Sequence, residues 1–182
     1  MKNATNLVVF LAAIVVPVQA GIISGTFDGN STLTPTPTPG IFTQNFSGDG
    51  DAAIFGSFTA TSTSTIDFSH PPSILVSDAM LVQTFGDGTL IGEGSGSGTG
   101  NGHGMATFTF DFLITEGTGI FEGDTGGVTV SGTITQTSPT TESVNASFTG
   151  SLTTVPEPSA LILLAAGFVA LGLRRRRSEK SR

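Results

Sequence analysis

The residues with the most specific chemistry form a short acidic motif near the C-terminus, Pro156-Glu157-Pro158. Each proline fixes its own φ and moves the preceding residue toward an extended backbone. The Glu157 carboxylate therefore stands on a stiff, non-helical stretch, where a processing enzyme can read it. An uncharged apolar run follows at residues 160–173, and after it come four basic residues, Arg174, Arg175, Arg176 and Arg177.

This apolar run is short for a membrane span. Its 14 residues would form a helix of about 21 Å, whereas the hydrocarbon core of a bilayer is about 30 Å thick. Snorkelling arginines and local thinning of the bilayer can cover part of the difference. We predict a transmembrane helix at residues 160–173, with Arg174 to Arg177 acting as a stop-transfer signal that stays in the cytoplasm.

The N-terminus has the order of a secretory signal peptide. Lys2 supplies positive charge, residues 7–16 are apolar, and Pro17 ends that run. Small residues at Val18 and Ala20 fit the pocket of signal peptidase. We predict cleavage after Ala20. The alternative is an uncleaved anchor, for which ten apolar residues are too few to span a bilayer comfortably.

The C-terminal arrangement resembles the PEP-CTERM sorting signal of Gram-negative bacteria. The matching parts are residues 155–159, the apolar run 160–173 and the basic cluster 174–177. The resemblance implies export, processing by an exosortase, and association with the cell surface and exopolysaccharide. It also implies that Pro156, Glu157 and Pro158 are the recognition residues.

Charge is distributed very unevenly along the chain. Between Gly21 and Val155 there are twelve Asp or Glu residues and no Lys or Arg. An acidic surface of this kind repels nucleic acid and anionic lipid. The chain has no Cys, so an oxidising compartment would add no disulfide.

Apolar and polar residues alternate along the middle of the chain, which predicts antiparallel strands with one wet face. The clearest segments are 54–68, 106–114, 128–135 and 143–152, and shorter candidates are 22–27, 41–46, 74–85 and 89–91. We therefore predict an all-β protein with a single antiparallel domain of about eight strands at residues 21–154, either a barrel or a sandwich. A signal helix at residues 1–20 and a sorting signal with a transmembrane helix at residues 155–182 flank this domain.

Turn residues predict the connections between these strands. We expect loops at residues 28–40, 70–72, 86–104 and 117–127, the third being Gly/Ser-rich and flexible. Residues 117–133, beginning Gly-Thr-Gly-Ile-Phe-Glu-Gly-Asp-Thr-Gly, resemble a pattern of small secreted bacterial β-barrels of the allene-oxide-cyclase-like kind. This resemblance favours the barrel over the sandwich.

Few residues in the middle could carry catalysis. His70 and His103 lie in predicted loops without a motif partner, and no Cys nucleophile is present. Asp49 and Asp51 are spaced like oxygen ligands of a hard cation, but no complete calcium loop surrounds them. We predict that the protein is not an enzyme and needs no cofactor, with Asp49 and Asp51 as the weak candidates for a metal.

The sequence favours an exported structural or interaction protein of the cell envelope, anchored in the membrane or released to the surface after processing. Its expected partners are signal peptidase, an exosortase, the membrane and exopolysaccharide, and not nucleic acid. The alternative is a secreted module that binds carbohydrate or another ligand, although the chain lacks the Trp and Tyr that sugar sites usually use.

Overall fold

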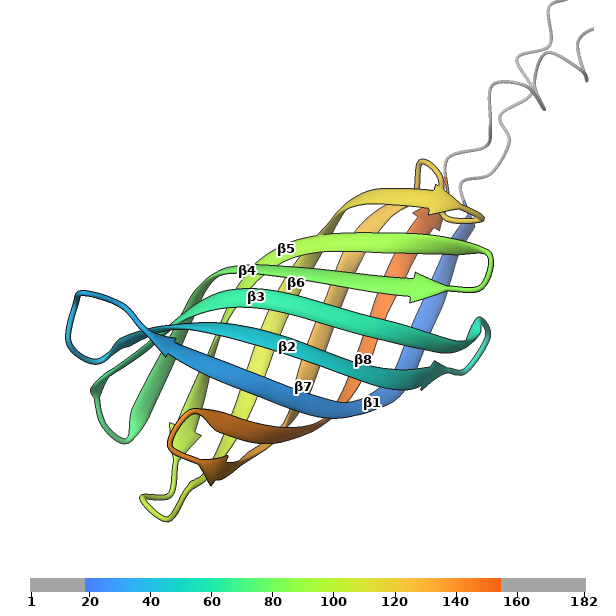
Figure 1. Ribbon diagram of the computed structural model, residues 1–182. Coiled ribbons are helices and arrows are strands. Elements are labelled where there is room, and N and C mark those ends of the chain that lie inside the picture. Colours follow the sequence, from blue (N-terminus) through green and yellow to red (C-terminus); the bar gives the residue numbers. More distant parts are fainter. Residues whose placement is uncertain (1–18, 155–182) are drawn as a thin grey trace, which may run out of the picture.

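A computed structural model describes residues 19–154, which form one closed barrel of antiparallel strands (Figure 1). The all-β prediction is confirmed, and the barrel is the correct choice over the sandwich. The eight strands are β1 (Gln19–Pro35), β2 (Ile41–Ala52), β3 (Gly56–His70), β4 (Ser73–Phe85), β5 (Gly88–Gly100), β6 (Met105–Gly119), β7 (Thr125–Ser138) and β8 (Thr141–Thr154).

Each strand pairs with its neighbours in sequence, and β1 also pairs with β8, so no strand edge is left open. The predicted signal helix at residues 1–20 falls almost entirely, and the transmembrane helix at 160–173 entirely, outside the described residues. Within residues 19–154 no helix is long and apolar enough to cross a membrane.

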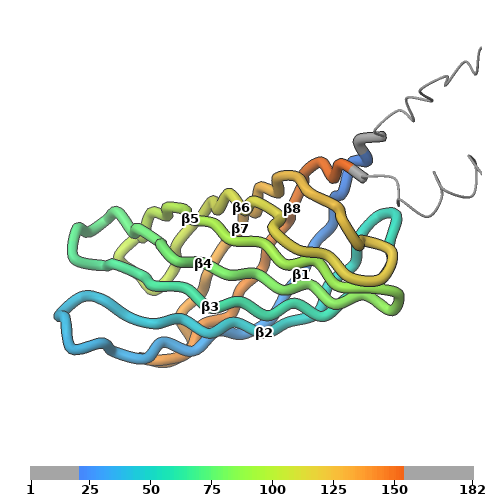
Figure 2. Tube along the Cα trace, turned by 90° about the horizontal axis from the view of Figure 1, so that it is seen from above, coloured from blue at the N-terminus to red at the C-terminus, as the bar shows by residue number. Residues whose placement is uncertain are grey.

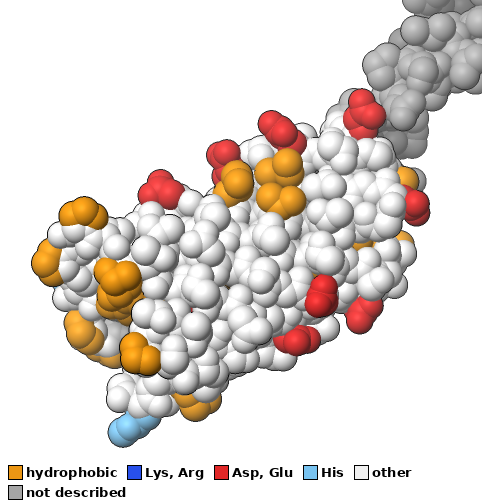
Figure 3. Space-filling model, in the orientation of Figure 1, with side chains coloured by type: hydrophobic (Ala, Val, Ile, Leu, Met, Phe, Trp, Pro, Cys, Tyr) orange, Lys and Arg blue, Asp and Glu red, His pale blue; other side chains and the backbone are white. Residues whose placement is uncertain are grey.

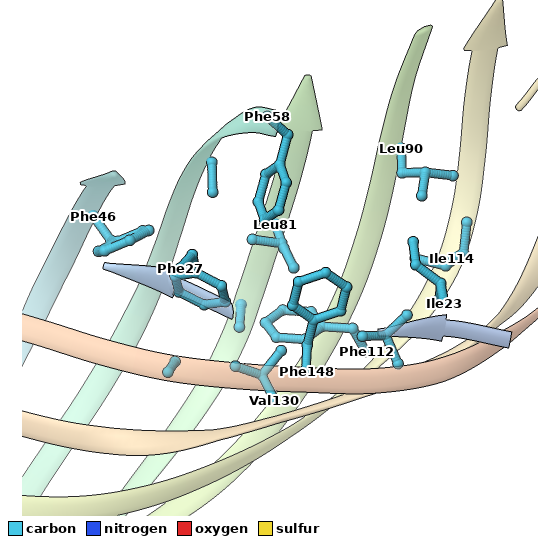
Figure 4. Close-up of a cluster of buried hydrophobic side chains, with 14 of the residues drawn as sticks. Ile23, Phe27, Phe46, Phe58, Leu81, Leu90, Phe112, Ile114, Val130 and Phe148 are labelled. Carbon is cyan, nitrogen blue, oxygen red and sulfur yellow. The ribbon is translucent and has the colours of Figure 1, made fainter. Parts of the chain in front are cut away.

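The alternation seen in the sequence sorts side chains between the interior and the outer wall. On β8, Val144, Ala146 and Phe148 are buried, while the residues between them are exposed. Figure 4 shows how rings and aliphatic side chains from strands all around the barrel converge on its centre. Phe27, for example, packs against Phe58 and Phe148 with ring centroids 6.5 and 6.3 Å away. Phenylalanine supplies eight of the 23 buried hydrophobic residues and is the one aromatic residue type in the core.

A bulge in β4 keeps its apolar residues inside. The register slips between Val76 and Ala79, where Ser77 and Asp78 are both exposed, and Asp78 has a φ of 51°. The extra residue switches the inward set from even to odd numbers, so Val76 and Ala79 are both buried. Without the bulge, one half of the strand would turn its apolar side chains toward water.

The predicted flexible loop at residues 86–104 is wrong, because most of it is strand β5. β5 pairs with β4 on one side and with β6 on the other, and only Asn101 to Gly104 form the connection to β6. The inward positions of β5 beyond Leu90 are glycines, which leave room for the phenylalanines of β6. A Cβ at Gly96 would collide with the ring of Phe110. The predicted loop at residues 28–40 is also too long, since β1 continues to Pro35.

The two ends of the barrel differ. At the end where the described chain starts and finishes, Phe55, Phe85 and Phe121 pack together with centroid distances of 4.9 to 6.0 Å. We call these three residues the aromatic plug and this end the plugged end. Gln19 pairs with Thr154 there, and Figure 2 shows the two chain ends side by side. The opposite end carries the β1–β2, β3–β4, β5–β6 and β7–β8 loops, and we call it the mouth.

Candidate functional site

A pocket of about 590 Å³ opens at the mouth. Its walls come from inward positions of the strands and its rim from the loops that join them. Most of the lining is apolar and includes Leu33, Phe42, Phe68, Ile74, Met105 and Ile134. We call this cavity the mouth pocket.

Hydrophobic residues are also prominent on the surface around the mouth. In Figure 3 they gather over the end with the β1–β2 and β3–β4 loops, whereas the acidic side chains lie along the wall and toward the plugged end. Pro71, Pro72 and Pro139 contribute to this rim and line the pocket. Apolar surface is not confined to the mouth, because Ile22, Ile54 and Ile120 are exposed at the plugged end.

Four polar side chains form a hydrogen-bonded network inside the barrel, next to the mouth pocket. Ser31 Oγ donates to Glu142 Oε2 at 2.7 Å, and Gln44 Nε2 donates to the same oxygen at 2.9 Å. Gln44 Nε2 also reaches Ser31 Oγ at 3.1 Å, and Ser64 Oγ donates to Gln44 Oε1 at 3.3 Å. All four residues are buried, and Glu142 is 6% exposed. We call this set the floor network.

Glu142 connects the floor network to the pocket, because it is a lining residue of the mouth pocket. Both donors of the network use Oε2, so Oε1 receives neither of these hydrogen bonds. The barrel has no Lys or Arg between Gly21 and Val155 that could pair with the carboxylate. A buried carboxylate without a cationic partner is unfavourable in a folded protein unless other groups compensate for it.

Below the mouth pocket the interior narrows. Two small cavities of about 30 Å³ each lie among Phe108, Phe110 and Ile134, which line both of them. Glu142 lines the upper of the two as well as the mouth pocket. A volume of this size is about that of one water molecule. A ligand larger than water would thus stop at the level of Glu142.

The structure separates the sequence-predicted residues of the middle from this pocket. Asp49 and Asp51 are exposed on the outer wall of β2, with Asp28 of β1 directly opposite Asp49. Within residues 19–154, no three His, Asp or Glu side chains lie close enough to hold a metal ion. Asp49 and Asp51 lie on the same exposed face of β2.

His70 is the last residue of β3 and His103 lies in the β5–β6 loop. Both are exposed at the mouth and do not line the pocket. The His70 ring is 2.8 Å from Ser69 Oγ, and the His103 backbone N–H donates to Asn101 Oδ1. Nearby, hydrogen bonds from the Ser69 side chain and backbone hold the pKa of Asp67 below its ordinary value, opposed by desolvation and assisted by the charge of His70. Asp67, Ser69 and His70 lie at the end of β3, next to the β3–β4 loop.

The predicted processing sites lie at or beyond the limits of the described residues. Ala20 pairs with Thr153 at the start of β1, so the predicted cut would leave a strand that begins at Gly21. Pro156, Glu157, Pro158 and Arg174 to Arg177 lie outside the described residues.

The floor network is what sequence reasoning missed, although a signal was present. Glu142 continues the inward series of Val144, Ala146 and Phe148 by two residues, and Gln44 stands between Phe42 and Phe46 on the inward face of β2. A polar residue in phase with core residues predicts a polar group inside the barrel. What the sequence could not show is that closure of the barrel brings β1, β2, β3 and β8 to one place.

Fold and pocket together define a class: a closed up-and-down β-barrel, plugged at one end and hollow at the other. Residues 154–177 match the PEP-CTERM protein-sorting motif. The chain therefore carries the signal of an exported protein that an exosortase sorts and that its C-terminal tail anchors at the envelope. Comparison with curated proteins and with solved structures gives no significant match. The resemblance to allene-oxide-cyclase-like barrels stays a prediction, as do the signal peptide and the transmembrane helix.

Proposed function

We propose that the protein is a small-molecule-binding barrel held at the cell envelope by its sorting signal. The observation that carries this proposal is the mouth pocket, whose volume of about 590 Å³ lies within the range of about 300–1,000 Å³ typical of ligand sites. An apolar lining with a few convergent polar groups is also typical of such sites. Ligand binding, which the sequence offered as the alternative, is therefore the function that the pocket supports better.

The direction of the barrel supports this function. The matched sorting motif begins at Thr154, the last residue of β8, at the plugged end. The mouth lies at the other end of the strands, where four loops surround it. An anchor attached after Thr154 would thus leave the pocket facing away from the point of attachment.

A structural or interaction role is the second candidate, and the polar outer wall favours it. Thr59, Thr61 and Thr63 of β3 are exposed, and opposite them on β2 lie Asp49, Ser47 and Asn45. Such a wall offers many hydrogen-bonding groups to a polymer such as exopolysaccharide. In both roles the protein would catalyse no reaction, and processing could release it from the membrane to the matrix.

The absence of Trp from the chain allows a direct test of pocket binding. Met105 lies at the rim of the mouth pocket and is 48% exposed, whereas Leu113, on the same strand and 63% exposed, does not line the pocket. Met105→Trp and Leu113→Trp therefore each place a single fluorophore, one at the pocket and one on the outer wall. The full chain in nanodiscs made with a non-aromatic polymer would be titrated with bromodecanol, because bromine quenches Trp on contact.

We expect saturable quenching of the Met105→Trp variant and only weak, non-saturable quenching of the Leu113→Trp variant. Equal quenching at both positions, or none at the pocket position, would show that the mouth does not bind apolar molecules. The structural role would then become the better explanation.

A further inference from the structure

If the mouth pocket binds small molecules as proposed, Glu142 is placed to determine which ligands bind there. It is the one side chain with an ionisable group among the described residues that line the mouth pocket. It is 6% exposed, comes from β8 and is a member of the floor network. A ligand that fills the pocket down to this level would cover the carboxylate.

The hydrogen bonds of the floor network leave Glu142 Oε1 without a donor from Ser31 or Gln44. An ionised carboxylate only accepts hydrogen bonds, and each of its two oxygens can accept more than one. Ser31 and Gln44 supply donors to Oε2 and not to Oε1. A ligand that covered Oε1 without donating a hydrogen bond would displace water from this oxygen and leave it without a donor. Such a loss is unfavourable for a charged group.

Within residues 19–154 the barrel supplies no Lys or Arg to this site. No Lys or Arg occurs between Gly21 and Val155, and the two histidines do not line the pocket. The twelve acidic residues of the same segment add a negative potential that disfavours anions. Any cation that meets Glu142 must therefore come with the ligand.

The geometry points to an apolar molecule with a hydrogen-bond-donating head, best an ammonium group, as the ligand of the mouth pocket. The head donates to Glu142 Oε1, and the apolar part extends along Phe42, Phe68 and Ile74 toward the rim. A molecule of the same shape with a carboxylate head is rejected, because two negative charges would then meet at a buried position. The neutral alcohol is intermediate, since a hydroxyl can donate but carries no charge.

Three probes of equal chain length test this order. Decylamine, decanol and decanoate would be titrated at neutral pH into the full chain carrying Met105→Trp, with fluorescence as the readout. We expect decylamine to bind about ten- to a hundredfold more tightly than decanoate, with decanol between them. The substitution Glu142→Gln, which keeps the size of the side chain, should remove most of the preference for the amine and leave decanol binding within a few-fold.

Glu93→Gln is the matched control. Glu93 is exposed on the outer wall of β5, so its replacement removes the same charge without touching the pocket. We expect it to leave the order of the three probes unchanged. Far-UV circular dichroism would confirm that both variants keep the β-barrel.

The outcomes separate the two proposals. If no probe binds saturably, both the binding function and the ligand class are wrong. If all three bind equally, or Glu93→Gln abolishes the preference as strongly as Glu142→Gln, the pocket binds apolar molecules but Glu142 does not select them. Preference for decanoate would overturn the ligand class directly.

Discussion

Two glutamines inside the barrel show how differently a buried amide can be accommodated. Gln44 gives and accepts hydrogen bonds within the floor network. Gln83 of β4 is 1% exposed, and within residues 19–154 neither its Nε2 nor its Oε1 has a partner. Its register partners are Ala60 and Leu90, which lie in the apolar core. The Gln44 amide thus belongs to the floor network, whereas the Gln83 amide is a local source of instability.

This contrast predicts opposite effects for the same substitution. Gln83→Met keeps the length of the side chain and removes an unsatisfied polar group, so it should raise the free energy of unfolding by about 1 kcal/mol or more. Gln44→Met removes a donor from Glu142 and should lower it by about 1–3 kcal/mol. Chemical unfolding followed by circular dichroism measures both, and a loss of stability in Gln83→Met would mean that its amide is satisfied.

Asp124 makes the plugged end sensitive to pH. It lies in the turn between β6 and β7, where its backbone N–H donates to the carbonyl oxygen of Phe121 at 3.0 Å and its Oδ1 has no partner within the described residues. Burial raises the pKa of Asp124 above its ordinary value of 3.8. The folded state therefore binds the proton more tightly than the unfolded state does.

The sign of the pH effect follows from that difference. Above the folded pKa, ionised Asp124 destabilises the barrel, and this penalty shrinks as the pH falls through the folded pKa toward 3.8. Asp124→Asn should therefore be more stable than the parent chain at pH 7, and the gain should diminish toward pH 4. Thermal unfolding at the two pH values measures it, and a gain that is the same at both would contradict a role for ionisation.

At the scale of elements, β5 and β6 form a complementary pair. Inward glycines on β5 face large inward side chains on β6, as Gly96 does with Phe110. Gly96→Val should therefore overpack the barrel and destabilise it by about 1–3 kcal/mol, or prevent folding. Ser95→Val is the control, because Ser95 is exposed on the same strand and valine favours strands there. A loss in Gly96→Val no larger than in Ser95→Val would contradict overpacking at Gly96.

The same pair of strands explains what the sequence could and could not predict. β6 is readable because Phe108, Phe110 and Phe112 alternate with polar residues. In β5 the sequence predicts a strand only at residues 89–91, since Gly94, Gly96 and Gly98 give no apolar signal. The rest of the strand forms because β4 and β6 pair with it on both sides. Tertiary pairing overrides local propensity in that case.

At the mouth, the sequence shows single polar residues such as Glu142 but not their meeting. The contact between Ser31 and Glu142 joins residues 111 positions apart, and it depends on the pairing of β1 with β8. Phe121 is a similar case at the other end. The sequence predicts only a loop around Phe121. In the structure its side chain is 1% exposed, because this turn folds over the barrel and completes the aromatic plug.

The start of the sorting motif and the mouth pocket lie at opposite ends of the barrel. The described chain begins and ends at the plugged end, and the matched sorting motif starts there. The mouth pocket lies at the far ends of the strands. Processing next to Thr154 would thus change how the barrel is held without altering the pocket, so sorting and ligand binding should be separable by mutation.

Glu157→Ala should block sorting while leaving the barrel intact. The resemblance implies that an exosortase recognises Pro156-Glu157-Pro158, so we expect the variant to keep its apolar run and arginine tail and to accumulate in the membrane of its native host. Glu179→Ala, a change of the same type beyond the arginine cluster, should be processed normally.

Intact-mass analysis of both proteins reports the signal-peptide cut and the sorting cut together, and pocket quenching of Met105→Trp should be the same in both backgrounds. Normal processing of Glu157→Ala would mean that the enzyme does not read this carboxylate, and altered quenching would mean that the two ends of the molecule are coupled.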